Sequence, residues 1–290
     1  MSFCAGRVVV VTGAGQGLGR AHALAFAAAG ARVVVNDVGT AAEAVAAEIR
    51  AAGGEAVASA GDVADWAYAH ALVRAAVEAY GRLDVLVNNA GLVRDRMLVS
   101  LTEAEWDEVL RVDLKGHAAP MRHAAAYWRD RAKAGEPVDA RIVNTSSGAG
   151  LMGSVGQLNY VAAKAGIAAM TVVAAVELAR YGVTVNAIAP SARTAMTQDV
   201  FADDMRAPEG GFDAMAPENV SPLVVWLGSA ESAGVTGRVF EVSGGSVSVA
   251  DGWQHGEAVD RGRRWRPEEL GPVVHDLLAA APKPAPVYGA

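Results

Sequence analysis

The 290-residue sequence contains a single cysteine, Cys4, and no long uninterrupted apolar run. One cysteine cannot form an internal disulfide or a cysteine metal cluster, and such sparing use is typical of a reducing cytoplasm. No membrane span is predicted, and residues 1–7 lack the basic region of a signal peptide. The sequence has 25 Lys and Arg residues and 32 Asp and Glu residues, which gives a formal net charge of −7. We therefore expect a cytoplasmic protein whose partners include neither nucleic acid nor a membrane.

What is present is an alternation of short β-branched runs and longer amphipathic stretches, which is typical of repeated βα units. A hydrophobic content of 52% is sufficient to cover both faces of a parallel sheet. The sequence predicts strands at 7–12, 32–36, 56–60, 83–89, 140–146, 184–189 and 238–243, and helices at 17–29, 41–52, 66–80, 103–134, 159–181 and 217–227. These elements predict one doubly wound α/β domain over residues 1–250.

Two segments interrupt this alternation. Residues 190–216, rich in Pro, Gly and acidic side chains, follow the sixth strand and lie at the edge of the sheet where ligands bind. They are either a substrate lid or a solvent loop. Residues 251–290 are expected to run over the surface or onto a neighbouring subunit. The extension contains a basic cluster of four arginines, Arg261, Arg263, Arg264 and Arg266. This cluster either binds the phosphate and adenine of a CoA, or it forms a face that contacts solvent or a neighbouring subunit.

The first strand leads directly into a glycine-rich turn that is followed by a helical pattern. Glycines let the backbone approach a pyrophosphate, and the helix that follows directs its N-terminal N–H groups at the phosphates. The spacing is T-G-x-x-x-G-x-G, because position 18 is leucine. The predicted contacts in this turn are Gly13, Gln16, Gly17, Leu18 and Gly19.

An acidic residue, Asp37, ends the second strand, 18 residues after Gly19. A carboxylate at this distance is typical of hydrogen bonding to the adenosine ribose, and it would repel the 2′-phosphate of NADP. Neither Gln16 nor Val38 supplies a compensating base, so the sequence favours NAD. Asp62 and Val63, after the third strand, either meet the adenine or begin the next helix.

Three residues predict the chemistry of the site. Ser147 ends the fifth strand, Tyr160 follows it by 13 residues, and Lys164 follows Tyr160 by four. Residues at i and i+4 share one helix face, so the lysine ammonium can favour the tyrosine phenolate and make Tyr160 a general acid/base near neutral pH. Ser147 would then hold the oxygen of an alcohol or ketone substrate.

The turn 12–19, Asn88-Asn89-Ala90-Gly91, Ser147, Tyr160 and Lys164 resemble, in order and spacing, the short-chain dehydrogenase/reductase family. The resemblance covers about residues 6–245. It implies a Rossmann-like domain with a seven-stranded parallel sheet, hydride transfer with a nicotinamide cofactor, and a homodimer or homotetramer. It also implies that Lys164 contacts the cofactor ribose and that the cofactor is flanked by Asn88, Asn89, Ala90 and Gly91.

The chain departs from the family pattern at two places. Asp113 stands where the family has an asparagine that positions a proton-relay water, so we expect it to retain the backbone kink while its charge alters the pH dependence. Pro190 is followed by Ser191 rather than glycine, which leaves the nicotinamide contact to Pro190 and Thr194, although a plain loop threonine is an equal alternative. The six histidines show no metal-ligand spacing, and we expect His22 and His123 to be packing or surface residues.

Further stretches, including 35–39, 141–147 and 156–160, are similar to one branch of that family. This branch comprises the dehydrogenase unit of peroxisomal multifunctional enzyme type 2 and bacterial 17β-hydroxysteroid or 3-hydroxyacyl-CoA dehydrogenases. The resemblance implies NAD-dependent oxidation of a secondary alcohol on an acyl-CoA or a steroid. The alternatives are an NADPH-dependent 3-oxoacyl carrier-protein reductase, which Asp37 disfavours, and a non-catalytic NAD-binding protein, which typically lacks the tyrosine or lysine.

Overall fold

The computed structural model describes residues 3–194, 208, 210–250 and 252–289. An eight-stranded sheet has the order β3-β2-β1-β4-β5-β6-β7-β8. Its strands are β1 (Val8–Val11), β2 (Arg32–Asp37), β3 (Glu55–Ala60), β4 (Val85–Asn88), β5 (Ala140–Thr145), β6 (Val183–Ser191), β7 (Val239–Ser243) and β8 (Ser246–Ala250). The first seven strands are parallel to one another. Chain order reverses between β1 and β4, so a crevice opens beyond their carboxyl ends.

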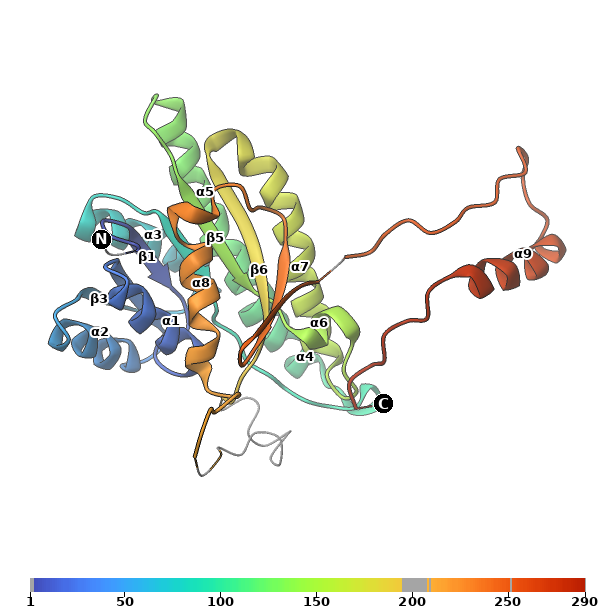
Figure 1. The fold of residues 1–290 in the computed structure, drawn as a ribbon, viewed down its shortest axis with the longest axis horizontal. Helices are drawn as coiled ribbons and strands as arrows, with labels where there is room; N and C mark the ends of the chain where they lie inside the picture. Colours follow the sequence, from blue (N-terminus) through green and yellow to red (C-terminus); the bar gives the residue numbers. More distant parts are fainter. Residues whose placement is uncertain (1–2, 195–207, 209, 251, 290) are drawn as a thin grey trace.

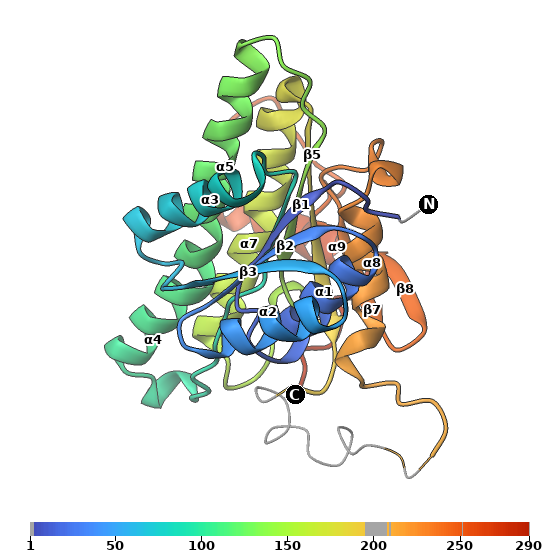
Figure 2. The ribbon, with the colours of Figure 1, turned by 90° about the vertical axis from the view of Figure 1, so that its left-hand side faces the viewer.

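Helices cover both faces of this sheet (Figures 1 and 2). They are α1 (Gly17–Ala28), α2 (Ala41–Ala51), α3 (Trp66–Tyr80), α4 (Glu103–Val109), α5 (Gly116–Lys133), α6 (Gly148–Met152), α7 (Leu158–Leu178), α8 (Ser221–Leu227) and α9 (Pro267–Ala280). Helices α1, α2 and α8 pack on one face around Phe26, Ile49 and Val224. Helices α3, α5 and α7 pack on the other face around Leu72 and Trp128. This double covering explains why β1 is entirely valine, since alternate side chains enter opposite cores.

The seven expected strands and the α/β class are confirmed, and an eighth strand was missed. Strand β8 pairs antiparallel with β7 across the turn at Gly244 and Gly245. Its Val247 and Val249 side chains are exposed at the edge of the sheet. Strand β6 also continues through Pro190 and Ser191, which pair with β7. The first two residues of the segment expected as a lid or loop, 190 and 191, therefore belong to the sheet.

The helix expected over 103–134 is present over 103–133, but it is not a regular α-helix throughout. Helix α4 ends at Val109, a π-helical turn spans Leu110–Lys115, and α5 begins at Gly116. A π-turn contains an extra residue per turn and is often found at functional sites. The expected helix at 217–227 likewise divides into a 3-10 turn, Pro217–Asn219, and α8.

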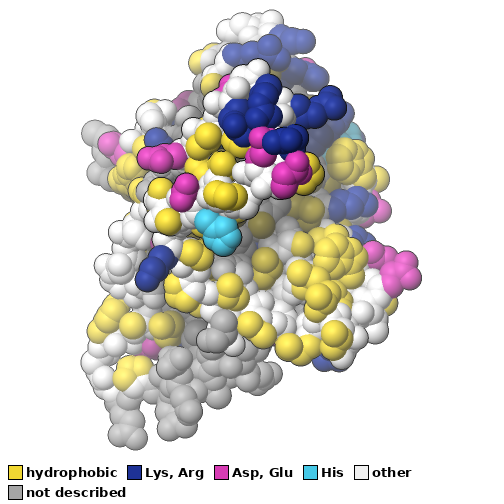
Figure 3. All heavy atoms as spheres, turned by 90° about the vertical axis from the view of Figure 1, so that its right-hand side faces the viewer, with side chains coloured by type: hydrophobic (Ala, Val, Ile, Leu, Met, Phe, Trp, Pro, Cys, Tyr) yellow, Lys and Arg dark blue, Asp and Glu magenta, His cyan; other side chains and the backbone are white. Residues whose placement is uncertain are grey.

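The carboxyl-terminal extension leaves the domain after β8 and reaches α9 far from the sheet before the chain end returns toward α4 and α6 (Figure 1). Helix α9 was not predicted, and it has no buried residue. Lys and Arg side chains gather on this side of the molecule (Figure 3). Three of the extension's arginines pair with one carboxylate, Glu269; they are Arg261, Arg263 and Arg266. In this single chain the extension forms an exposed arm, and whether it also contacts a neighbouring subunit stays a prediction.

Among the described helices, the stretch Leu158–Tyr181, which includes α7, is long and apolar enough to cross a membrane. In the fold, this helix lies against the sheet and buries residues such as Ile167 and Thr171 along one side. Apolar character is therefore needed for packing in the domain. Three valines on α7 remain largely exposed, namely Val172, Val173 and Val176.

Candidate active site

The glycine-rich turn joins β1 to α1 and packs tightly against the end of β4. A Cβ on Gly13 would lie 2.7 Å from the Cα of Ala90, and a Cβ on Gly19 would lie 2.1 Å from the Gly13 carbonyl oxygen. Gly13 and Gly17 also have positive φ angles of 59° and 52°. Gln16, at the N-cap of α1, makes no side-chain capping hydrogen bond. The turn therefore fits a pyrophosphate, since it has room for a close approach and an uncapped helix start.

Asp37 ends β2 beside this turn. Its Oδ2 accepts a hydrogen bond from the Gly15 N–H at 2.9 Å, and its Oδ1 accepts one from the Val38 N–H at 2.7 Å. A Cβ on Gly15 would lie only 2.8 Å from Asp37 Oδ2. The carboxylate is thus held at the edge of the crevice, with no basic partner among its described contacts. This position fits the adenosine ribose of a dinucleotide.

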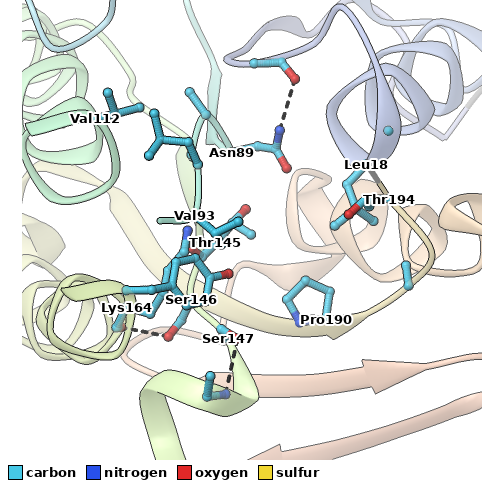
Figure 4. A pocket seen from close by; sticks show the side chains of 18 of the residues that line it. Leu18, Asn89, Val93, Val112, Thr145, Ser146, Ser147, Lys164, Pro190 and Thr194 are labelled. Carbon is cyan, nitrogen blue, oxygen red and sulfur yellow. Dashed lines mark hydrogen bonds between the residues drawn. The ribbon is translucent and has the colours of Figure 1, made fainter. Parts of the chain in front are cut away.

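The end of β4 is fastened to the glycine-rich turn by Thr12 and Asn89. The Thr12 Oγ1 accepts hydrogen bonds from the N–H groups of Asn89 and Ala90 at 2.9 and 3.1 Å. The Asn89 side chain donates back to the Thr12 and Gly13 carbonyls (Figure 4). Asn88 instead points into the core and bonds Asn144 at 2.9 Å. Asn89, Ala90 and Gly91 therefore line the crevice, whereas Asn88 supports it from below.

Three of the four predicted catalytic side chains come from the junction of β5 with α6 and from α7. Ser147 follows β5 as the N-cap of α6, where its Oγ accepts a hydrogen bond from the Ala149 N–H at 3.2 Å. Lys164 is 3% exposed, and its Nζ donates to the Thr145 carbonyl at 3.0 Å (Figure 4). The same Nζ lies 5.3 Å from the centre of the Tyr160 ring. The helical spacing of Tyr160 and Lys164 thus places the ammonium beside the phenol, as expected.

Asp113 lies in the π-turn, fully buried behind this group. Its Oδ1 accepts the Leu92 N–H at 2.8 Å, and its Oδ2 lies 3.2 Å from Lys164 Nζ. Burial raises the pKa of Asp113 more than Lys164 lowers it. Burial is the largest single influence on Lys164 and by itself would lower its pKa, but Asp113 and Tyr160 together outweigh it, so the pKa is raised. The expected kink is present, and the carboxylate touches the lysine.

One cavity of about 900 Å³ at the carboxyl edge of the strands unites these residues. Three predicted site residues do not line it: Gly19 lies beneath the turn, Asn88 points into the core, and Asp113 lies behind Gly91 and Lys164. The predicted residues that do line it are Gly13, Gln16, Gly17, Leu18, Asp37, Asp62, Val63, Asn89, Ala90, Gly91, Ser147, Tyr160, Lys164, Pro190 and Thr194.

Asp62 and Thr194, for which the sequence left two alternatives each, both lie at the cavity. Asp62 lines the cavity, accepts the Ala64 N–H and pairs with Arg111, whereas the next helix is capped by Asp65 and not by Asp62. Thr194 lies beside Leu18 at the start of α1 (Figure 4).

Residues 195–207 and 209 of the expected lid lie outside the described residues. The base of this segment is closed by a hydrogen bond from the Arg193 N–H to the Met215 carbonyl at 2.7 Å.

The two histidines assigned to packing do pack. His22 is buried with its Nδ1 2.9 Å from Ser221 Oγ, and burial lowers its pKa to about 3. The His123 ring contacts Trp66 and His70. Over the described ranges, no group of three His, Cys, Asp or Glu side chains is placed to hold a metal ion.

Several cavity residues were not predicted. Leu92, Val93 and Met215 add apolar wall, and Ser154 adds a hydroxyl. The least expected is Tyr288, which reaches the cavity from the end of the carboxyl-terminal extension. No local pattern in the sequence indicates such a contact, because it joins segments far apart in the chain.

Comparison with known proteins agrees with this geometry. The family model for short chain dehydrogenases matches residues 7–205. The chain belongs to the short-chain dehydrogenase family. It is therefore an NAD(P)-dependent oxidoreductase, and the resemblance seen in the sequence is confirmed.

Individual relatives extend the likeness to the whole chain. The chain is 50% identical to the hydroxyacyl-CoA dehydrogenase ChsB1 of Mycobacterium tuberculosis, over 94% of this chain and 89% of that protein. It is 43% identical to the peroxisomal multifunctional enzyme type 2 of Mus musculus, over 83% of this chain but 32% of that longer protein. A crystal structure of a short chain dehydrogenase from Mycobacterium avium shares 64% identity with a TM-score of 0.92, and the match covers 99% of this chain and 100% of that one. The extension is therefore part of the shared structure.

Proposed function

We propose that the protein oxidises a 3-hydroxyacyl-CoA ester to the 3-oxoacyl-CoA ester with NAD+. The observation that carries this proposal is the meeting of Ser147, Tyr160 and Lys164 with the glycine-rich turn in one cavity. The acyl-CoA substrate class is supported by the 50% identity to an enzyme of that name. A site that retains all three side chains also argues against a purely dinucleotide-binding role.

The choice of NAD+ is supported by Asp37. Its carboxylate is fixed by the Gly15 and Val38 N–H groups at the edge of the crevice, so it cannot turn away easily from an adenosine ribose. A 2′-phosphate there would meet a negative charge without a compensating base. This arrangement disfavours the carrier-protein reductase alternative, which requires NADPH.

Each site residue has a distinct role in this reaction. The bound dinucleotide supplies the acceptor for the hydride that leaves the carbinol carbon. Ser147 Oγ hydrogen-bonds the substrate oxygen, and Tyr160 Oη removes its proton, so that the carbon–oxygen double bond forms as the hydride departs. The Lys164 ammonium stabilises the phenolate form of Tyr160. Lys164 is held for this role by the Thr145 carbonyl and by Asp113.

Asp113 acts as a positioning residue rather than as a catalytic one. It touches Lys164 and the Leu92 N–H but does not line the cavity. Its carboxylate fixes the lysine side chain and at the same time offsets part of the lysine's charge.

The proposal includes a homodimer or homotetramer in the cytoplasm. Val172, Val173 and Val176 form an exposed apolar face on α7, and such a face is typical of an oligomer contact. The single cysteine is buried, which suits a reducing compartment. Multi-angle light scattering tests the oligomer, and cell fractionation tests the location.

The decisive experiment follows NADH formation by the purified protein with a 3-hydroxyacyl-CoA and, in parallel, a 17β-hydroxysteroid. We expect turnover of the acyl-CoA with NAD+ and at least tenfold lower kcat/KM with NADP+. Turnover of the steroid alone would reject the acyl-CoA assignment. A preference for NADP+ would reject the Asp37 argument and favour the reductase alternative. Tyr160→Phe, which retains the ring but not the hydroxyl, controls for contaminating activity.

A further inference from the structure

Near the end of the chain, Tyr288 makes backbone hydrogen bonds to the active-site loop between α6 and α7. The Tyr288 N–H donates to the Gly153 carbonyl at 3.2 Å, and the Val155 N–H donates to the Tyr288 carbonyl at 2.9 Å. These two bonds make a parallel β-bridge between Ser154 and Tyr288. The position of the tail is therefore set by backbone pairing as well as by side-chain contact.

Glycines at the start of α6 and in the loop that follows it leave room for the tail's side chains. A Cβ on Gly148 would lie 3.0 Å from the Tyr288 hydroxyl oxygen, and a Cβ on Gly153 would lie 3.3 Å from a methyl group of Val287. Gly148 directly follows Ser147, the predicted substrate-holding serine. The Tyr288 ring thus lies next to the residue that would hold the reacting oxygen.

Tyr288 faces the cavity and is incompletely covered by protein. It lines the cavity together with Leu92, Val93 and Met215, and it remains 46% exposed. Its neighbours Gly148 and Ser154 lie on the substrate side, whereas the dinucleotide side is formed by the glycine-rich turn and Asp37. A half-exposed aromatic ring at that place gains most by contact with an apolar ligand.

We infer that the carboxyl-terminal tail completes the substrate site, with Tyr288 packing against the apolar carbon skeleton of the substrate beside Ser147. This inference rests on the proposed function for its ligand class, a secondary alcohol on an extended acyl chain or ring system. It makes Tyr288 a specificity-determining residue. Larger substrates reach the ring, whereas the shortest acyl chains do not.

The arm that carries the tail makes this inference testable without unfolding the domain. Residues 252–264 and helix α9 are largely exposed, so tail substitutions leave the packed sheet untouched. Trp253, fully exposed on the same arm, provides a matched aromatic control.

The first experiment measures KM and kcat for two 3-hydroxyacyl-CoA esters, a four-carbon one and a long-chain one. We expect Tyr288→Ala to raise KM for the long-chain ester about tenfold and to change KM for the short ester and for NAD+ less than twofold. Tyr288→Phe should behave like the wild type if the ring makes the contact, and Trp253→Ala should change nothing. Equal effects on both esters, or none on either, would overturn the inference.

A second experiment tests the position of the tail without any turnover. A Cβ on Gly289 would lie 3.8 Å from the Cβ of Val155, which is the separation found in disulfides. We expect the Val155→Cys, Gly289→Cys double variant to form a disulfide under mild oxidation, while Cys4 stays buried and unreacted. Because Gly289 has a φ of 75°, which strains a cysteine, a short bifunctional thiol cross-linker is used in parallel, and absence of both the disulfide and the cross-link would overturn the inference. If the disulfide forms but neither ester is oxidised by the wild type, the proposed function fails and the position of the tail stands.

Discussion

The Nζ of Lys164 lies 3.2 Å from Oδ2 of Asp113, and both side chains are almost completely buried. On its other side, the same ammonium lies 5.3 Å from the centre of the Tyr160 ring. One positive charge therefore has two acidic neighbours. The carboxylate that fixes the lysine also weakens the field that favours the phenolate.

This arrangement predicts the pH dependence of Asp113→Asn. The substitution removes a negative charge near Tyr160, so the phenolate becomes more favourable and the acid limb of kcat/KM for alcohol oxidation moves to lower pH. A unit charge at about 7 Å and an effective dielectric near 20 is worth at most about 2 kcal/mol, so we expect a shift of about one pH unit. Asp107→Asn, an exposed neighbour on α4, is the matched control. A shift to higher pH would contradict the assigned role.

Tyr160→Phe tests the proton transfer itself. Removal of a general acid/base typically costs between about 10² and 10⁴ in rate, and we expect kcat to fall by that factor. Because Phe retains the ring that packs beside Lys164, NADH binding measured by fluorescence titration should change less than twofold. A variant with normal kcat would show that the proton leaves by another route.

Asp37→Ser tests the basis of cofactor choice. Removing the carboxylate at the end of β2 removes its repulsion of a 2′-phosphate, so the ratio of kcat/KM for NADP+ to that for NAD+ should rise at least tenfold. Asp62→Asn, which lines the same cavity but pairs with Arg111, should leave this ratio within about twofold. If both variants changed the ratio equally, the choice between NAD+ and NADP+ would depend on the overall charge of the cavity and not on Asp37 in particular.

Gly13→Ala tests the close packing of the glycine-rich turn. The new Cβ would lie 2.7 Å from the Ala90 backbone at a φ of 59°, so we expect a loss of about 1–3 kcal/mol in the free energy of unfolding and weaker NADH binding. Gly234→Ala is the control, because a Cβ there meets nothing within 4 Å. Chemical denaturation and NADH fluorescence measure the two effects. Unchanged stability and binding would refute the steric argument.

We expect buried His22 to lower the free energy of unfolding in acid. Burial lowers its pKa to about 3, below the reference value near 6.5 that applies to the unfolded chain. The unfolded state therefore binds the proton first, and His22 costs about 1.4 kcal/mol of stability per pH unit as the pH falls from about 6.5 toward 3. His22→Gln retains a hydrogen-bonding group for Ser221 but does not titrate. Its unfolding free energy should depend less steeply on pH over this range, and an unchanged slope would rule out the contribution of His22.

Local sequence was sufficient for much of the fold and the site. Strands such as β1 are recognisable because a strand buried on both faces must be apolar throughout. The glycine-rich turn and the i, i+4 pair of Tyr160 and Lys164 are recognisable because their geometry depends on residues close together in the chain. Parallel strands end at one edge, which then brings Ser147 to the same crevice.

The missed features depend on contacts between distant segments. Whether the helix over 103–134 stays regular or widens into a π-turn depends on the contacts of Asp113 with Lys164 and the Leu92 N–H. Local helix propensity does not reflect these contacts, because the partners lie far away in the sequence. Helix α9 lies outside the βα alternation from which the other helices were predicted, and none of its residues is buried.

Periodicity and short spacings along the chain encode seven of the eight strands, the cofactor turn and the three side chains Ser147, Tyr160 and Lys164. The contact of Asp113 with Lys164 and the place of Tyr288 beside Ser147 exist only in the folded chain. Both relationships arise when the chain folds back on itself, and the free energy that fixes them comes from burial and pairing between segments that share no local pattern.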